Sequence, residues 1–230
     1  MRRAFLTRGL PADSPYFVIA RTAGFELEAT AVLDVRYLPF AYPPSPDWLF
    51  AYSANAVQGF LQRTGARTWL AAHPRLQIAA MGEGTAAPWR AAGIPPAFVG
   101  SGEPSVVARV FAEVAAGARV AFLQAAESRE SVATLLGHRL TALPTPTYQS
   151  APRTGFAPEH AEVALLTSPK SAKGFLAAYA KTHGTPAAHA LRLYAIGTTT
   201  ATAVAASGYE VDVARDVTVR GLIEMLFEVA

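Results

Sequence analysis

The sequence contains no cysteine among its 230 residues, which excludes disulfide bonds, thiolate nucleophiles and zinc–thiolate sites. Its five histidines show no spacing typical of a metal site, so we expect no bound metal. No uninterrupted apolar run reaches the roughly 18 residues that a membrane-spanning helix requires. Near the N-terminus, Arg8, Pro11 and Asp13 interrupt the apolar residues, which argues against an export signal. We therefore expect a cytoplasmic protein that does not associate with membranes.

The chain is also poor in charge. Only 16% of its residues are charged, with 20 Lys and Arg residues against 17 Asp and Glu residues. Because no basic run or Arg-rich helix is present, we do not expect binding of nucleic acid. Apolar residues make up 51% of the chain, which is enough for a sizeable core. The length fits either two small domains or one large α/β domain.

Short apolar runs alternate with longer segments in which apolar residues recur at helical spacing. Among the runs that predict strands are Glu28–Val35, Trp48–Ser53 and Glu162–Thr167. The alternation is typical of α/β proteins, in which helices cover parallel sheets. Two proline-rich segments, Tyr37–Pro46 and Pro144–Pro158, break the pattern, and we interpret them as extended crossings between domains.

The chain also contains an internal repeat. An offset of 115 residues superimposes Ser53 on Ser168, Gly59-Phe60-Leu61 on Gly174-Phe175-Leu176, Gly82 on Gly197, Thr85 on Thr200 and Gly93 on Gly208. Abundant alanine explains chance apolar matches, but it does not explain matched glycines and threonines at one offset. The sequence therefore predicts two related βαβα units.

In each copy a serine directly follows a predicted strand and precedes a predicted helix. Ser53 and Ser168 are expected helix N-caps, and Pro169 suits the first helical position. One interpretation is that both hydroxyls only cap their helices. The other is that they contact a ligand, because open α/β sheets bind ligands at the carboxyl ends of their strands and helix N-termini hold anions. The residues leave both interpretations open.

The second repeated element is Gly-x-x-Thr-Ala, found at Gly82–Ala86 and Gly197–Ala201. Each copy follows a predicted strand and opens a predicted helix. The segment Gly82–Ala87 also satisfies a loose dinucleotide-binding fingerprint, although the second copy lacks the middle glycine. Four helix N-termini of this kind suit a ligand with several carboxylates, and no acid–base dyad or triad accompanies them.

Taken in order, these motifs resemble the uroporphyrinogen-III synthase family. The motifs are Leu6-Thr7-Arg8, Phe50-Ala51-Tyr52-Ser53-Ala54-Asn55-Ala56-Val57, Met81-Gly82-Glu83-Gly84-Thr85-Ala86, Thr147-Tyr148-Gln149, Leu166-Thr167-Ser168-Pro169 and Ala195-Ile196-Gly197-Thr198-Thr199-Thr200-Ala201. The resemblance spans essentially the whole chain. It implies two similar α/β domains with parallel sheets, joined by a two-stranded linker, with the ligand cleft between them. Residues 1–36 plus 153–230 would form one domain, and residues 37–152 the other.

The resemblance also implies a reaction. A lyase of this family closes the linear tetrapyrrole hydroxymethylbilane to uroporphyrinogen III in haem biosynthesis, with loss of water, inversion of ring D and no cofactor. The accepted scheme passes through a spirocyclic pyrrolenine. Because the substrate also closes unaided to isomer I, the enzyme's task is mainly one of orientation.

Candidate site residues follow from the same resemblance. Tyr148 matches the family's linker tyrosine and is the candidate catalytic residue, since a phenol can donate a proton to a departing hydroxyl. In the turn Gln124–Arg129, many relatives carry a more basic, glycine-containing sequence, but Ser128 and Arg129 are kept as candidates. The full set of candidate substrate-binding residues is Thr7, Arg8, Ser53, Asn55, Gly82, Thr85, Ser128, Arg129, Thr167, Ser168, Gly197, Thr199 and Thr200.

Two other functions remain open. A non-catalytic, two-lobed protein that binds an anionic small molecule would share the duplicated architecture, because a fold does not dictate a function. A nucleotide-dependent enzyme that uses Gly82–Ala87 would instead bind a dinucleotide measurably. No helix shows an additional apolar stripe, so we expect a monomer.

Overall fold

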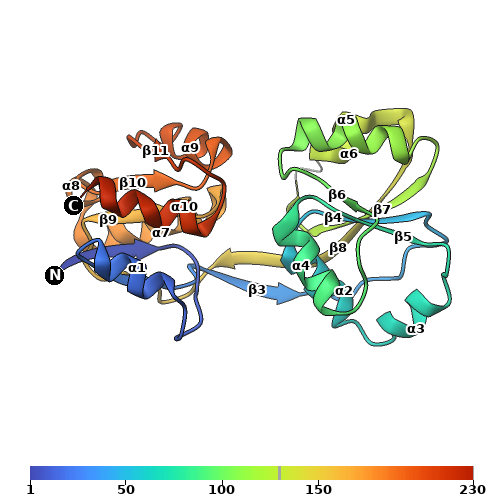
Figure 1. Ribbon diagram of the computed structural model, residues 1–230, viewed down its shortest axis with the longest axis horizontal. Coiled ribbons are helices and arrows are strands. Elements are labelled where there is room, and N and C mark those ends of the chain that lie inside the picture. The colour runs from blue at the N-terminus through green and yellow to red at the C-terminus, as the bar shows by residue number, and fades with distance from the viewer. Residues whose placement is uncertain (129–130, 230) are drawn as a thin grey trace. The chain divides into compact units, whose positions relative to one another are not determined.

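The computed structural model describes residues 1–128 and 131–229 and confirms an α/β fold with two parallel-containing sheets flanked by helices (Figure 1). The chain divides into two compact units. Unit 1 comprises Met1–Asp34 and Ala151–Ala230, and unit 2 comprises Val35–Ser150. Both boundaries between the units fall inside strands, namely β3 (Leu33–Tyr37) and β8 (Thr141–Pro152), which are neighbours in one sheet.

Unit 1 contains a parallel sheet with the strand order β11-β10-β9-β1-β2. Successive residues of β1 point to opposite faces: Leu6 packs with α1 and α10, whereas Phe5 packs with α7, α8 and α9. Burial on both faces explains the apolar runs Ala4–Leu6 in β1 and Val163–Leu166 in β9. The elements are β1 (Arg2–Leu6), α1 (Tyr16–Thr22), β2 (Phe25–Ala29), β9 (Val163–Leu166), α7 (Pro169–His183), α8 (Thr185–His189), β10 (Arg192–Ala195), α9 (Thr198–Ala205), β11 (Asp212–Val213) and α10 (Val219–Glu224).

Unit 2 contains the sheet with the strand order β3-β8-β7-β4-β5-β6, in which β8, β7, β4, β5 and β6 pair in parallel. One face packs on α5 and α6 around Phe111, and the other packs on α2, α3 and α4 around Phe60 and Trp89. The remaining elements are β4 (Trp48–Ala51), α2 (Ala54–Leu61), α3 (Ala66–Ala71), β5 (Gln77–Ala80), α4 (Glu83–Ala91), β6 (Phe98–Val99), α5 (Pro104–Val114), β7 (Arg119–Ala125) and α6 (Ser131–Leu136).

The internal repeat corresponds to matching elements in the two units. Strands β4 and β5 begin 115 residues before β9 and β10, and helices α2 and α4 begin 115 residues before α7 and α9. The first strand of each repeat copy, β4 or β9, has a second neighbour in its sheet, and this neighbour comes from a different part of the chain in the two units. In unit 2 it is β7, which follows the repeat, whereas in unit 1 it is β1, from the start of the chain. The two units therefore share one architecture with a permuted chain order.

The expected strand Glu28–Val35 is in fact two strands. β2 ends at Ala29 and β3 begins at Leu33, because the chain leaves the first sheet between them and buries Val32 against the α7 side of unit 1. A single continuous segment therefore contributes strands to two sheets.

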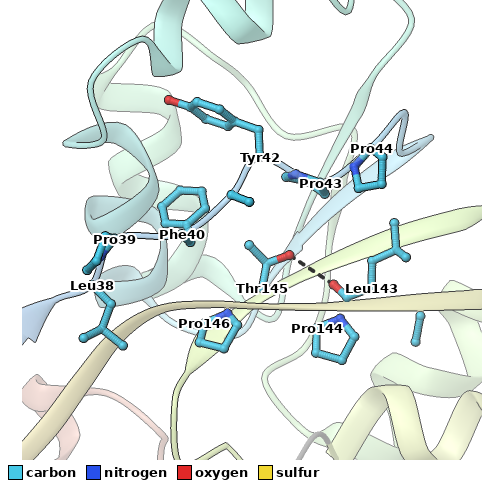
Figure 2. A pocket seen from close by; sticks show the side chains of 12 residues that line it. Leu38, Pro39, Phe40, Tyr42, Pro43, Pro44, Leu143, Pro144, Thr145 and Pro146 are labelled. Atoms are coloured by element: carbon cyan, nitrogen blue, oxygen red, sulfur yellow. Dashed lines mark hydrogen bonds between the residues drawn. The ribbon is translucent and has the colours of Figure 1, made fainter.

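The sequence predicts that the first proline-rich segment crosses between the units, and the structure shows that it does not. Tyr37–Pro46 lies inside unit 2, where residues 38–44 line a groove together with residues 142–146 of β8 (Figure 2). The Thr141 N–H donates to the carbonyl of Ala118, the residue just before β7. Backbone N–H groups alternate in direction along a strand, so the even-numbered positions 144 and 146 face away from β7, and proline is tolerated there.

Candidate active site

In unit 2 two helices begin at the same edge of the sheet. β4 is followed by Ser53, whose Oγ accepts the Ala56 N–H at 3.2 Å and caps α2. The neighbouring strand β5 leads through Gly82 into α4. Because β4 and β5 are adjacent parallel strands, their carboxyl ends and both helix N-termini lie at one edge. This edge offers free backbone N–H groups suited to an anionic ligand.

The candidate catalytic Tyr148 lies at this edge and contacts Ser53. Ser53 Oγ donates a hydrogen bond to the Tyr148 hydroxyl at 3.0 Å. Burial is the main cause that raises the pKa of Tyr148; the nearby Glu127 carboxylate raises it further, while the bond from Ser53 lowers it. Tyr148 is therefore a neutral phenol at neutral pH, the protonation state that a proton donor needs.

A register shift and a close helix contact place Tyr148. β8 pairs regularly with β7 up to Pro146, and an irregularity between Gln124 and Ala125 then brings Ala125 opposite Tyr148. The preceding Thr147 is fully buried and donates its hydroxyl to the Ala56 carbonyl of α2 at 3.0 Å. Sequence reasoning missed Thr147, although it directly precedes the tyrosine of a quoted motif.

The start of α4 contains two further candidate residues. Gly82 is extended and packs closely on Gly102, since an added Cβ would lie 3.2 Å from the Gly102 Cα. Thr85 is buried in the first turn, where its N–H donates to the Gly82 carbonyl. Glu83 is exposed and forms an ion pair with Arg90. Gly82 therefore meets a packing requirement of this turn. A glycine needed for packing also satisfies the loose dinucleotide-binding fingerprint, so the fingerprint does not by itself indicate a dinucleotide.

Unit 1 presents the equivalent edge with a different set of side chains. Ser168 caps α7 by accepting the Ser171 N–H at 3.1 Å, and its Oγ lies 2.7 Å from Ser171 Oγ. Thr7, at the end of β1, accepts the Thr167 N–H at 3.0 Å, and its Oγ1 lies 3.1 Å from Thr167 Oγ1 and 3.3 Å from Ser171 Oγ. The predicted Thr7, Thr167 and Ser168 thus form one hydroxyl cluster with Ser171.

Sequence reasoning missed Ser171, which is buried within this cluster. A serine three residues into a helix that already begins with a capping serine attracts no special notice. The internal repeat offered the signal, because the equivalent position in unit 2 is an alanine, Ala56.

The other predicted residues of unit 1 lie at helix and strand ends. Gly197 precedes α9 in an extended conformation, like Gly82 in the other copy. Thr200 is buried in the first turn of α9, whereas Thr199 is exposed there. Arg8 follows Thr7 and is exposed.

The remaining candidates belong to unit 2. Asn55 lies in the first turn of α2 and is partly exposed. Ser128 follows β7 in a turn, where its N–H donates to the Ala125 carbonyl at 3.0 Å. Arg129, also predicted, lies outside the described residues.

Two features of other protein classes are absent from the described part of the chain. Within residues 1–128 and 131–229, no three His, Asp or Glu side chains gather closely enough to hold a metal ion. In the same ranges, no helix combines the length and apolarity needed to cross a membrane.

Comparison with known proteins places this architecture. The family model described as uroporphyrinogen-III synthase HemD matches residues 20–224. A uroporphyrinogen-III synthetase from Helicobacter pylori superposes with a TM-score of 0.72 at 17% identity, covering 100% of both chains. A mutant uroporphyrinogen III synthase from Thermus thermophilus superposes with a TM-score of 0.60 at 17% identity, covering 99% of this chain and 98% of that one. No curated protein sequence matches significantly.

Proposed function

This chain belongs to the uroporphyrinogen-III synthase family of tetrapyrrole biosynthesis, and from that premise we propose that it is a hydro-lyase that converts hydroxymethylbilane to uroporphyrinogen III. The observation that supports this most is the family match across residues 20–224. The reaction removes one water molecule and inverts ring D, and it uses no cofactor.

Binding of the substrate's carboxylates is assigned to the strand edges of both units. The helices α2, α4, α7 and α9 each begin directly after a strand of their own sheet. The N–H groups of a helix's first turn carry partial positive charge, so each N-terminus favours an anion. In α2 and α7 the capping serine already accepts one of these N–H groups, and Pro169 at the start of α7 has none. Binding through backbone dipoles suits a chain whose formal charge is only +3. Polar side chains at these positions, such as Asn55 and Thr199, would add hydrogen bonds.

The proton balance of the reaction assigns a role to Tyr148. The bond between the hydroxymethyl carbon and its oxygen breaks, and the departing hydroxyl leaves as water once it receives a proton. The half-buried phenol of Tyr148 supplies that proton. Ring D then forms a carbon–carbon bond through its substituted carbon, which gives the spirocyclic pyrrolenine. The bond from that carbon to its original methylene bridge breaks, and the bridge carbon rejoins ring D at the unsubstituted carbon. The proton lost from this carbon as the ring regains aromaticity restores the phenol. The net change is the loss of one water molecule.

Selectivity for isomer III is assigned to orientation of the bilane. Spontaneous closure uses the unsubstituted carbon of ring D, so the protein must hold this ring with the substituted carbon nearest the cation. We further assign the protein to the cytoplasm as a monomer that binds neither nucleic acid nor membranes.

The main alternative is a protein that binds an anionic tetrapyrrole without converting it. Disappearance of hydroxymethylbilane at a protein concentration far below that of the substrate separates the two functions. An enzyme consumes many equivalents of substrate faster than the buffer does, and its rate is proportional to protein concentration. A protein that only binds the substrate removes at most one equivalent of it from solution. That outcome would overturn the proposed function.

A further inference from the structure

The two capping serines occupy equivalent positions in the repeat, yet their hydroxyls have different hydrogen-bond partners. Ser168 Oγ lies 2.7 Å from the hydroxyl of Ser171 within its own helix. The position equivalent to Ser171 in unit 2 is Ala56, which carries no hydroxyl. Ser53 instead donates to the phenol of Tyr148, 95 residues away in the chain.

Ser53 donates its single proton to Tyr148. Its Oγ accepts the Ala56 N–H and donates to the Tyr148 oxygen, 3.0 Å away. Tyr148 then acts as the acceptor in this pair, and its own proton is left to point elsewhere. Within the described residues, the bond with Ser53 is the only hydrogen bond of the Tyr148 hydroxyl. The phenol proton is therefore available to a ligand.

We propose that Ser53 is a positioning residue that turns the proton of Tyr148 toward the substrate's departing hydroxyl and then donates a hydrogen bond to the phenolate that remains. This inference rests on the proposed function, and it gives Ser53 a role other than the substrate contact expected from the sequence. Ser53 acts through Tyr148, so the two residues form one functional unit.

The surroundings of Tyr148 make this hydrogen bond important. Among the described groups, the Glu127 carboxylate, in the loop after β7, interacts electrostatically with the phenol. Its negative charge opposes formation of a phenolate. Burial opposes it as well. Ser53 is the group that favours the phenolate, because a hydrogen bond to the charged form stabilises that form.

Titration of Tyr148 by NMR tests the contact without any substrate. Protein labelled with ¹³C at tyrosine Cζ reports each ionisation, and Tyr148→Phe identifies the signal. We expect Ser53→Ala to raise the pKa of Tyr148 and Ser53→Thr to restore it, since threonine keeps the hydroxyl. Ser168→Ala is the matched control, because it removes the equivalent cap from unit 1 and should leave the titration of Tyr148 unchanged.

Steady-state kinetics test the consequence for turnover. We expect Ser53→Ala to lower kcat about tenfold with KM changed less than about twofold, and to have no further effect when combined with Tyr148→Phe. Should Ser53→Ala fail to fold, Ser53→Gly remains acceptable at an N-cap and carries neither a hydroxyl nor a charge. It should likewise raise the pKa of Tyr148 and lower kcat.

The two measurements separate failure of this inference from failure of the proposed function. An unchanged Tyr148 pKa in Ser53→Ala, or an equal loss of kcat in the Tyr148→Phe background, would overturn the positioning role. If the wild-type protein does not convert hydroxymethylbilane, the proposed function fails and the catalytic part of this inference fails with it. In that case the NMR titration would still decide whether Ser53 controls the ionisation of Tyr148.

Discussion

A Cβ atom added to Gly59 would lie only 2.5 Å from the carbonyl oxygen of Thr147. Helix α2 and strand β8 therefore touch backbone to backbone, one residue before the candidate catalytic tyrosine. Gly174, its equivalent in the repeat, has more room: its nearest neighbour would be a side-chain atom of Leu33, at 3.6 Å. One repeated glycine thus serves a close contact, and the other does not.

Alanine at the two glycines should have opposite effects. Gly59→Ala forces β8 away from α2, so we expect a loss of about 1–3 kcal/mol in the free energy of unfolding and a lower kcat, because Tyr148 moves with Thr147. Gly174→Ala lies within helix α7 with space available, and it should stabilise by up to about 1 kcal/mol. Urea unfolding of both variants checks this. Equal effects of the two substitutions on stability would show that the contact between Gly59 and Thr147 does not hold β8, and with it Tyr148, in place.

Replacing Tyr148 with phenylalanine removes the proposed proton donor but keeps the ring. We expect kcat to fall about ten- to a hundredfold rather than to vanish, since orientation supplies most of the selectivity. The pKa of Tyr148 lies above its usual value, so the wild-type enzyme should lose activity to tyrosine ionisation only above about pH 10. That alkaline decline should be missing from the Tyr148→Phe profile. Unaltered turnover in the variant would return Tyr148 to a structural role.

Thr7→Val should destabilise unit 1 without changing the volume of the side chain much. Thr7 Oγ1 accepts the Thr167 N–H, and valine leaves that donor without its acceptor. The expected loss is about 1–3 kcal/mol in urea unfolding, and Thr7→Ser should retain most of the stability. Thr22→Val is the matched control at an exposed helical site, with an expected change below about 0.5 kcal/mol. A loss for Thr7→Val no larger than that of the control would contradict the importance of the cluster.

Glu28 provides a test of stability against pH. Burial is the main cause that raises its pKa, and the Glu159 carboxylate adds to the effect. The folded state therefore holds the proton more tightly than the unfolded state. The stability that this tighter proton binding at Glu28 contributes is complete below the unfolded-state pKa of about 4.3. It is lost as the pH rises through the folded-state pKa. Glu28→Gln has no proton to lose, so its stability relative to wild type should increase between about pH 4 and neutral pH. Urea unfolding across this range would contradict the assignment if the difference stayed constant.

The fold class and the internal repeat were predictable because local signals carry them. Apolar runs buried on both faces mark the strands, and the capping Ser53 and Ser168 mark the starts of α2 and α7. The break within Glu28–Val35 was not predictable, since no glycine or proline interrupts the run and only the tertiary structure sends its two halves to different sheets. The prolines of Tyr37–Pro46 predict a crossing between domains, and that prediction is wrong because composition does not distinguish a crossing from an extended segment packed on its own unit.

Contacts within the candidate site depend on pairing that sequence spacing does not determine. Ser53 meets Tyr148 only because β8 pairs with β7 and shifts register between Gln124 and Ala125. Thr7 meets Ser171 because β1 joins β9 across most of the chain length. The residue types at the site were predictable, but the hydrogen-bond partners were not.

The most direct test of the central claim is the identity of the tetrapyrrole isomer that the protein forms. Hydroxymethylbilane generated in place would be incubated with purified protein in the presence of a chelator and without nucleotide. The products would then be oxidised to porphyrins and separated chromatographically into isomers I and III. The account predicts a dominant isomer III peak that grows with protein concentration. Isomer I alone, formed at the rate seen without protein, would contradict it.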